Sequence, residues 1–297
     1  MSFPILLVML VYLNGSILPA ADARVSVFDR GFLFGDAVYE GIRAFSGWVR
    51  HLDDHAKRMQ QGLDEAGIRW DAQHLHDLCG PLLDANGLRD AFLYWQVTRG
   101  TPKPGQPVRA RLAEADIEPT VFGYCVPQPG VDALREPTVC SAVTVPDLRW
   151  HRGHIKSTAL LANIITAMTA TQAGGDEAIM LRDGFVSESC STNVFAVVRT
   201  PEGLELRTPP VEGMSILPGV TRQIILDTCP EAKVAPISAA QLAEAEEVFL
   251  TGTLTTVKSV VQLDGHPVGT GTPGPLARRV LDRYTIYLRE QIAQHTL

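Results

Sequence analysis

The stretch that decides the fold is RWHRGHIKSTALLAN, residues 149–163. It sets Lys156 between a basic cluster and a small, apolar run, in a chain where only five of the 26 basic residues are lysines. A lysine in such company is either a surface residue whose stem lies along apolar neighbours or an amine kept for covalent chemistry. The surface interpretation is the more common one for a lysine before a helix. Choosing between the two interpretations therefore requires evidence from other parts of the sequence.

The residues after Lys156 predict a helix over 157–173 with a continuous apolar face. We expect this face to pack into a core and to hold the lysine near a buried surface. Burial and neighbouring cations, here Arg149 and Arg152, favour the neutral and nucleophilic form of an amine.

Length and composition narrow the class of protein. The chain has 297 residues, enough for two domains, and its 45% hydrophobic and 20% charged content is typical of a globular protein. A net charge of −7 without a long basic block argues against nucleic-acid binding. Five scattered cysteines indicate reduced thiols and a cytoplasmic protein. No H-E-x-x-H spacing occurs among the eight histidines, and we expect no metal site.

The N-terminal segment, MSFPILLVMLVYL, is apolar, and LPAA at 18–21 resembles a cleavage site. No lysine or arginine precedes Arg24, so the basic start of a signal peptide is missing. The run is too short to span a bilayer, and we expect no membrane segment. VYLNGSIL instead predicts two strands around an Asn14-Gly15 turn. Met9 can serve as the start, which leaves residues 1–8 as an extension.

Hydrophobic periodicity predicts mixed helices and strands. ARVSVFDRG (23–31) alternates like a strand, and residues 34–49 predict a short helix or turn and another strand. Further helices are predicted at 52–66, 73–86, 219–228 and from 275, and further strands at 92–100, 120–126, 138–145, 177–182, 193–199 and 246–251. A loop with four prolines fills 101–119. The Pro- and Gly-rich stretch after it predicts a linker at 125–134 between domains at 1–124 and 135–297.

Three other features could serve a cofactor with a ring nitrogen and a phosphate. Glu188 lies in a turn rich in serine, threonine and asparagine before an apolar strand. Pro218 and Gly219 open an amphipathic helix whose N–H groups, with the Thr221 hydroxyl, form an anion site. VFLTGTLTTV (248–257) ends a strand in hydroxyl-bearing residues. An amine, a carboxylate and a phosphate cup are the handles that pyridoxal phosphate needs.

Six stretches in order resemble the class IV aminotransferases, the fold type IV pyridoxal-phosphate enzymes. This family includes D-amino-acid, branched-chain and (R)-amine transaminases and aminodeoxychorismate lyase. The stretches are VFDRGFLFGDAVYEGIRAF (27–45), YWQVTRGT (94–101), DLRWHRGHIKSTALLAN (147–163), SESCSTNVF (187–195), ILPGVTR (216–222) and VFLTGTLTTV (248–257).

The resemblance implies an α+β fold of two domains, an N-terminal α/β sandwich and a C-terminal pseudo-barrel, with pyridoxal 5′-phosphate as cofactor. It implies a homodimer in which the 101–119 loop contributes to the partner's site. Lys156 matches the Schiff-base lysine, Glu188 the partner of the pyridine nitrogen, and Tyr39 the active-site tyrosine. The side chain that packs on the ring matches Leu217, and the phosphate contacts match Arg58, Val220, Thr221 and Thr253.

The implied reaction moves an amino group from a D-amino acid or related amine to a 2-keto acid such as pyruvate or 2-oxoglutarate. YWQVTRGT and DLRWHRGHIKS are most similar to D-amino-acid transaminases. That family's Arg-x-His pair for the substrate carboxylate falls on Pro104 and Gln106 here, which leaves as candidates Lys103, Arg109 and Arg111. The alternatives are an (R)-amine transaminase, which needs no such trap, a branched-chain transaminase, to which YEGIRAF is similar, and an aminodeoxychorismate-type lyase.

Overall fold

The computed structural model describes residues 9–113 and 116–295, so the predicted extension at 1–8 lies outside it. The chain forms two compact units. Unit 1 comprises the residues up to Gly130 together with Ile155–Ala159, and unit 2 comprises Val131–His154 with Leu160–His295. The stretch around Lys156 therefore belongs to unit 1, although its neighbours on both sides in the sequence belong to unit 2.

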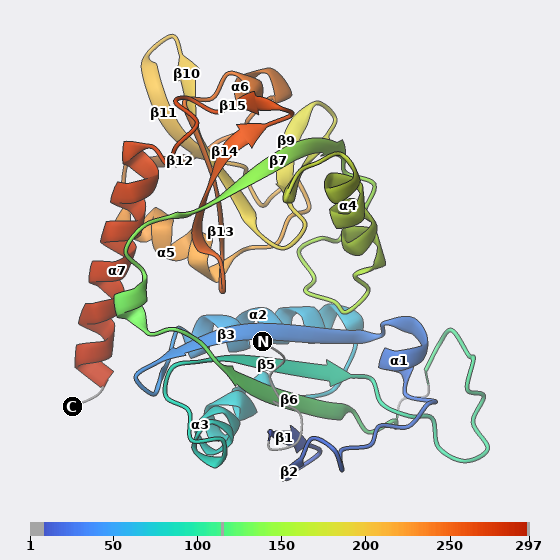
Figure 1. The fold of residues 1–297 in the computed structure, drawn as a ribbon. Coiled ribbons are helices and arrows are strands. Elements are labelled where there is room, and N and C mark those ends of the chain that lie inside the picture. The colour runs from blue at the N-terminus through green and yellow to red at the C-terminus, as the bar shows by residue number, and fades with distance from the viewer. Residues whose placement is uncertain (1–8, 114–115, 296–297) are drawn as a thin grey trace. The chain divides into compact units, whose positions relative to one another are not determined.

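Unit 1 is a six-stranded antiparallel sheet with helices beside it (Figure 1). The strand order is β2-β1-β6-β5-β3-β4. The strands are β1 (Leu10–Leu13), β2 (Ser16–Pro19), β3 (Ala37–Phe45), β4 (Trp48–Val49), β5 (Ala91–Thr98) and β6 (Thr120–Pro127). The helices are α1 (Arg30–Phe34), α2 (Leu52–Ala66), η2 (Ala72–His74) and α3 (Leu75–Ala85). The predicted hairpin at Asn14-Gly15 is confirmed, and β6 reaches into the first residues of the predicted linker.

The predicted helix at 52–66 is confirmed, and its apolar spacing explains where it packs. Ala56, Met59 and Leu63 recur every three or four residues and are fully buried in one core with strand residues such as Ile42 and Trp95. Gly67 ends the helix in the left-handed conformation that glycine adopts without strain. The 3.6-residue period is thus enough to predict this layer of unit 1.

The predicted strand at 23–31 is wrong. Residues 23–29 contain no strand, and α1 begins at Arg30. The Asp29 carboxylate accepts hydrogen bonds from the Gly31 backbone and from the hydroxyls of Thr98 and Thr120. This buried cap fixes a turn where the alternation of apolar residues favours a strand.

Unit 2 is built on a nine-stranded sheet in the order β12-β11-β10-β13-β14-β7-β8-β9, with β15 paired to β14 (Figure 1). Its strands are β7 (Thr138–Pro146), β8 (Glu177–Arg182), β9 (Phe185–Ser189), β10 (Asn193–Thr200), β11 (Gly203–Thr208), β12 (Ala232–Val234), β13 (Glu247–Gly252), β14 (Thr256–Leu263) and β15 (His266–Pro267). Its helices are η3 (Val131–Ala133), α4 (Leu161–Gln172), α5 (Val220–Thr228), α6 (Ala239–Ala243) and α7 (Pro275–His295). The end strand β9 approaches β10, so the sheet is curled. The α+β class is confirmed.

The helix predicted over 157–173 begins four residues later, at Leu161, and its predicted packing is wrong. Four apolar side chains on α4 are more than half exposed in the single chain, namely Leu161, Ile164, Ile165 and Met168. The helix is buried only at Ala170, which packs with Ala178 and Met180 of β8. A small residue lets the helix approach the sheet there, and the larger apolar residues point elsewhere.

Two kinds of feature are absent from the described residues, a membrane-spanning helix and a cluster of metal ligands. No helix in residues 9–113 and 116–295 combines the length and apolarity needed to cross a membrane. Over the same ranges, His, Cys, Asp and Glu side chains form no group of three that could hold a metal ion.

Candidate active site

Lys156 is positioned by backbone pairing with the first residues of β3, on the side where β4 pairs only with the other end of that strand. The Tyr39 N–H donates to the Lys156 carbonyl at 2.9 Å, and the Thr158 N–H donates to the Ala37 carbonyl at 3.1 Å. The Lys156 Nζ lies 3.4 Å from the Tyr39 hydroxyl and 4.4 Å from the centroid of its ring. The structure thus brings together two residues that the sequence assigned to the site from stretches 117 positions apart.

Tyr39 belongs to a stack of aromatic rings that the sequence analysis missed. Its ring lies 5.5 Å from that of Tyr94, and Tyr94 lies 5.1 Å from Tyr124, both in stacked geometry. Burial, with Tyr39 and Tyr124 beside it, raises the pKa of the Tyr94 hydroxyl far above its usual range, so this group donates a hydrogen bond, to Gln96 at 2.8 Å. The signal was present in the neighbouring aromatic strands 92–98 and 120–126. The stack holds the Tyr39 ring beneath the lysine.

Arg58 is held by two residues that the sequence analysis did not assign. Its guanidinium donates from Nε and Nη2 to the two carboxylate oxygens of Glu40, each at 2.7 Å, and His55 Nδ1 lies 2.7 Å from the same carboxylate. Burial would raise the pKa of Glu40, but Arg58 and His55 outweigh it and hold that pKa well below its usual range. Burial lowers the pKa of His55 to about 4, so His55 is neutral at pH 7. The sequence feature that could have identified this group is Glu40 itself, a charged residue among the apolar residues of a predicted strand.

Glu188 is clamped by three donors within unit 2. Arg149 Nη1 donates to Glu188 Oε1 at 2.6 Å. The Leu217 N–H donates to Oε2 at 3.1 Å, and the Asn193 amide lies 3.4 Å from the same oxygen. Asn193 also donates to the Leu217 carbonyl at 3.0 Å, which ties the carboxylate to the residue predicted to pack on the cofactor ring. A charge-assisted bond of this kind favours the ionised carboxylate.

A second carboxylate orients Arg149. Asp147 accepts from Arg149 Nε and Nη2, each at 2.9 Å, and from the Ser187 hydroxyl at 2.8 Å. Burial would raise the pKa of Asp147, but the hydrogen bonds and charge of Arg149 lower it to about 2. Within unit 2, Arg149 therefore bonds both Asp147 and Glu188.

The sequence predicts an anion site at the start of α5. Its first turn contains Val220 and Thr221, and its N-cap, Gly219, supplies no side-chain hydrogen bond to the backbone N–H groups. A side chain at Gly219 would not fit, because its Cβ would lie 2.0 Å from the Asn193 amide oxygen. The turn after β13 carries the predicted Thr253, which is half-buried.

Two buried hydroxyls support the fit of a phosphate-bearing cofactor in unit 2. Thr192 Oγ1 and Thr251 Oγ1 have no partner among the described residues. Asn193 and Thr251 face each other across β10 and β13, and the Thr192 methyl lies next to Gly252. Uncapped N–H groups with unpaired hydroxyls nearby are donors suited to an anion.

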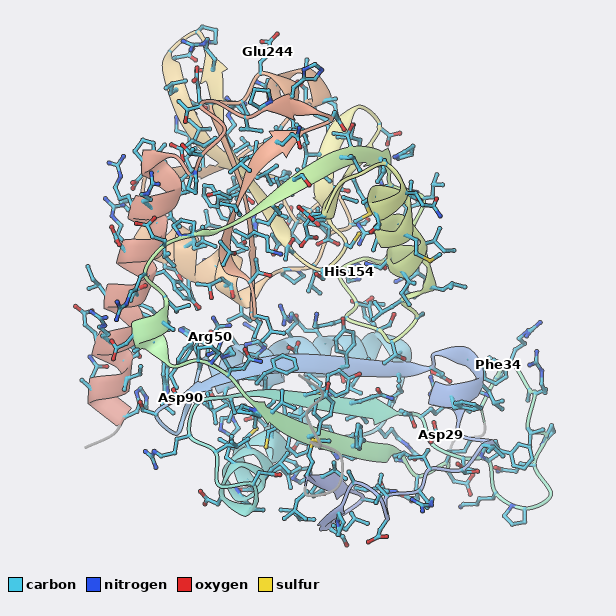
Figure 2. The ribbon with its side chains drawn as sticks, in the orientation of Figure 1. Asp29, Phe34, Arg50, Asp90, His154 and Glu244 are labelled. Carbon is cyan, nitrogen blue, oxygen red and sulfur yellow. The ribbon has the colours of Figure 1, made fainter. Side chains whose placement is uncertain are left out.

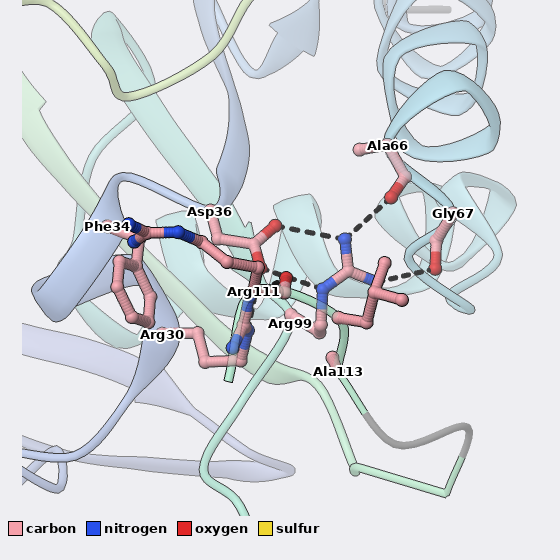
Figure 3. A pocket seen from close by; sticks show the side chains of 9 residues that line it. Arg30, Phe34, Asp36, Ala66, Gly67, Arg99, Arg111 and Ala113 are labelled. Carbon is pink, nitrogen blue, oxygen red and sulfur yellow. Dashed lines mark hydrogen bonds and ion pairs between the residues drawn. The ribbon is translucent and has the colours of Figure 1, made fainter. Parts of the chain in front are cut away.

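The three candidate cations of the 101–119 loop lie in different surroundings. Lys103 is paired with Asp116 in an exposed ion pair. The Arg109 guanidinium lies over the Phe34 ring, 5.2 Å from its centroid. Arg111 lines a cavity of about 480 Å³ together with Arg30, Asp36 and Arg99 (Figure 3). The geometry therefore does not gather the three cations into one carboxylate site.

The model of the protein family described as "Amino-transferase class IV" matches residues 37–263 of this chain. The match covers most of the chain, and the chain belongs to the class IV aminotransferases. It is an enzyme of the transferase class, and this family uses pyridoxal 5′-phosphate, so the predicted family, fold, activity and cofactor are confirmed.

Individual relatives divide between two substrate classes. The chain is 36% identical to a D-alanine aminotransferase of Bacillus licheniformis, over 92% of this chain and 94% of that one. It is 33% identical to a putative branched-chain-amino-acid aminotransferase of Methanocaldococcus jannaschii, over 93% and 95% of the two chains. A branched-chain aminotransferase structure from Thermoproteus uzoniensis with norvaline is similar with a TM-score of 0.78, at 26% identity and 93% coverage of each chain.

Proposed function

We propose that this aminotransferase takes the amino group of D-amino acids and passes it to a 2-keto acid such as pyruvate or 2-oxoglutarate. The observation that carries the choice of D-amino acids is the 36% identity to a D-alanine aminotransferase over nearly the whole of both chains. The Arg149–Glu188 ion pair supports it, because Arg149 comes from the DLRWHRGHIKS stretch that is most similar to D-amino-acid transaminases.

The residues present fit the cofactor, and each would hold a different part of it. Lys156 would bind the aldehyde carbon, and Glu188 would accept a hydrogen bond from the ring nitrogen. Leu217 would pack on the ring. The phosphate would be bound by the start of α5 at Val220 and Thr221, by Thr253 and by Arg58.

When bound, pyridoxal phosphate accepts the electron pair left on the α-carbon of the donor as its proton departs. Lys156, released by the incoming amine, takes that proton on Nζ and returns it later in the half-reaction. The Tyr39 hydroxyl, 3.4 Å from Nζ, orients the amine for this transfer. Arg149 donates to Glu188 at 2.6 Å and orients its carboxylate, and an ionised carboxylate there would keep a proton on the ring nitrogen.

A D-amino acid also needs a cation for its carboxylate, since an ionised carboxylate is strongly disfavoured in a pocket without one. We assign this role to the 101–119 loop, where Arg109 and Arg111 are free of the ion pair that engages Lys103. A branched-chain L-amino acid is the second candidate donor, favoured by the 33% identity to the relative from Methanocaldococcus jannaschii.

A panel of donors tests the proposal. D-alanine, L-leucine and (R)-1-phenylethylamine are each paired with pyruvate or 2-oxoglutarate, and the keto products are measured. We expect kcat/KM to be highest for D-alanine. A higher value for L-leucine or for the amine would overturn the choice of D-amino acids and leave the aminotransferase activity untouched. Release of pyruvate from aminodeoxychorismate without a keto acceptor would identify the lyase.

We further propose a homodimer in the cytoplasm. The four exposed apolar side chains of α4 are the kind of surface that a second copy covers, and the five cysteines are all free thiols. Light scattering of the purified protein should give twice the 32.3 kDa chain mass. A monomer with full activity on dilution would contradict the dimer.

A further inference from the structure

The stretch Asp29-Arg30-Gly31, part of the first family-like motif, has no part in the proposed function. Asp29 is fully buried, and its carboxylate accepts from the Thr98 hydroxyl at 2.9 Å and from the Thr120 hydroxyl at 2.7 Å. Thr98 ends β5 and Thr120 begins β6. Asp29 therefore joins the two ends of the connection that contains the 101–119 loop. Figure 2 shows Asp29 and Phe34 at the α1 end of the sheet of unit 1.

Arg30 holds the middle of the same loop. Its guanidinium is buried and donates from Nη1 to the Ala110 carbonyl at 2.7 Å and from Nη2 to the Arg111 carbonyl at 3.2 Å. Ala110 lies between the two loop arginines, Arg109 and Arg111. Arg30 thus binds the backbone at the point that carries both candidate partners of the substrate carboxylate.

Arg30 is itself fixed to the body of unit 1 (Figure 3). Its Nε donates to Asp36 Oδ2 at 2.8 Å, and Arg99 donates to both oxygens of the same carboxylate. Arg99 also donates to the carbonyls of Ala66 and Gly67 at the end of α2. Burial would raise the pKa of Asp36, but the hydrogen bonds from Arg99 and Arg30 lower it, so Asp36 remains an anion between two cations.

The Phe34 ring adds a second contact to the loop. The Arg30 guanidinium lies 4.8 Å from its centroid and the Arg109 guanidinium 5.2 Å. The ring thus joins the side chain that binds the loop backbone to a candidate for the substrate carboxylate. A loop of this length without secondary structure would otherwise sample many conformations, and each substrate would have to order it on binding.

We propose that Arg30 is a positioning residue for the substrate carboxylate, because it holds the loop backbone between Arg109 and Arg111 in one conformation. This inference rests on the proposed function, in which the loop supplies the cation that meets the carboxylate. Arg30 acts through the loop and itself touches neither substrate nor cofactor.

The test compares the Arg30→Gln and Arg30→Lys holoenzymes with wild type. Loss of the charged hydrogen bonds should raise the KM for D-alanine roughly ten-fold, with kcat near the wild-type value. The KM for (R)-1-phenylethylamine, which has no carboxylate, should stay unchanged. Lysine should not restore the KM, because one ammonium cannot replace a planar fork that serves two carbonyls and Asp36. Arg89→Gln is the matched control, since Arg89 also donates to a loop carbonyl of unit 1, that of Ser46, and should behave as wild type.

Limited trypsin digestion measures directly how well the loop backbone is held in place. Cleavage after Arg109 and Arg111 should be faster in both Arg30 variants than in wild type and in Arg89→Gln. An equal rise in KM for both donors, a loss confined to kcat, or a wild-type cleavage rate would overturn the proposal. Wild-type behaviour of Arg30→Lys beside an impaired Arg30→Gln would also overturn it, because charge beside Asp36 would then be sufficient.

The two proposals fail in different ways. If wild type turned over no D-amino acid, the proposed substrate class would fall, and the trypsin comparison alone would decide the role of Arg30 in the loop. If D-alanine were a good substrate and its KM did not respond to Arg30, only the positioning role would fall. Should Arg30→Gln fail to fold, Arg30→Lys carries both measurements.

Discussion

Replacing Arg149 by glutamine removes a guanidinium that bonds both Asp147 and Glu188. The Arg149 side chain is 8% exposed, and those of Asp147 and Glu188 are 0% and 7% exposed. Breaking a buried ion pair by deleting one partner costs about 3–5 kcal/mol of folding free energy when the remaining charge is left uncompensated. Arg182 Nη2 lies 2.9 Å from Asp147 Oδ2 and still compensates part of that charge. We therefore expect Arg149→Gln to lose less than this at neutral pH, roughly 1–3 kcal/mol.

The loss should depend on pH in a defined direction. The pKa of Asp147 is lowered from 3.8 to about 2, so its stabilising contribution is present above about pH 3.8 and is lost as the pH falls towards 2. The variant lacks the share of this contribution that Arg149 supplies, while Arg182 and Ser187 keep theirs. The difference in stability between wild type and variant should therefore be largest near pH 7 and should narrow below about pH 4.

Denaturant unfolding of the cofactor-free proteins measures this difference from the midpoints. Arg199→Gln is the control, because Arg199 is an arginine of the same unit whose ion pair with Glu246 is exposed, and exposed pairs contribute little. An Arg149→Gln protein as stable as the control at pH 7, or a difference that grows in acid, would refute the clamp on Glu188.

Three further results are expected. Glu188→Gln should keep the fold and bind the cofactor but slow α-proton removal, since an amide does not favour a proton on the ring nitrogen. Single-turnover rates within a few-fold of wild type would show that Glu188 has no role in the reaction. Lys103, Arg109 and Arg111 are each replaced by alanine. Loss of the cation that binds the substrate carboxylate should raise the KM for D-alanine by roughly ten- to a hundred-fold and leave the KM for the (R)-amine unchanged. Three variants with wild-type KM values would show that the loop does not bind the carboxylate. Stability should fall as the pH drops from 6.5 towards 4, because the unfolded chain protonates His55 more readily than the folded one, and His55→Asn should flatten that slope in denaturant midpoints.

Local sequence patterns predicted most of the helices and strands. They could not predict which distant segments contact one another. The helix at 52–66 and the hairpin at Asn14-Gly15 follow from periodicity and turn chemistry within a few residues. The bonds of Glu40 to Arg58 and of Arg149 to Glu188 join different elements, and a residue type alone does not say which partner it meets. The sequence also did not predict that Ile155–Ala159 belongs to unit 1, because this follows from backbone pairing with β3, a strand more than 100 residues earlier in the chain.

Two errors show where a local pattern was overruled. Alternation at 23–31 favoured a strand, but the buried Asp29 carboxylate bonds three donors that only the folded chain brings together. The apolar face of α4 predicted burial, yet Ile164 and Met168 are exposed in the single chain. Periodicity identifies which face of a helix is apolar, and it does not say whether the covering surface belongs to the same chain.

Borohydride reduction of the protein loaded with pyridoxal phosphate, followed by peptide mass mapping, tests the role of Lys156 most directly. We expect one phosphopyridoxyl adduct, on Lys156, whose Nζ lies 3.4 Å from the Tyr39 hydroxyl. Lys258, which pairs with Glu177, and Lys103, which pairs with Asp116, should remain unmodified. An adduct on either of these lysines, or none at all, would contradict the assignment of Lys156.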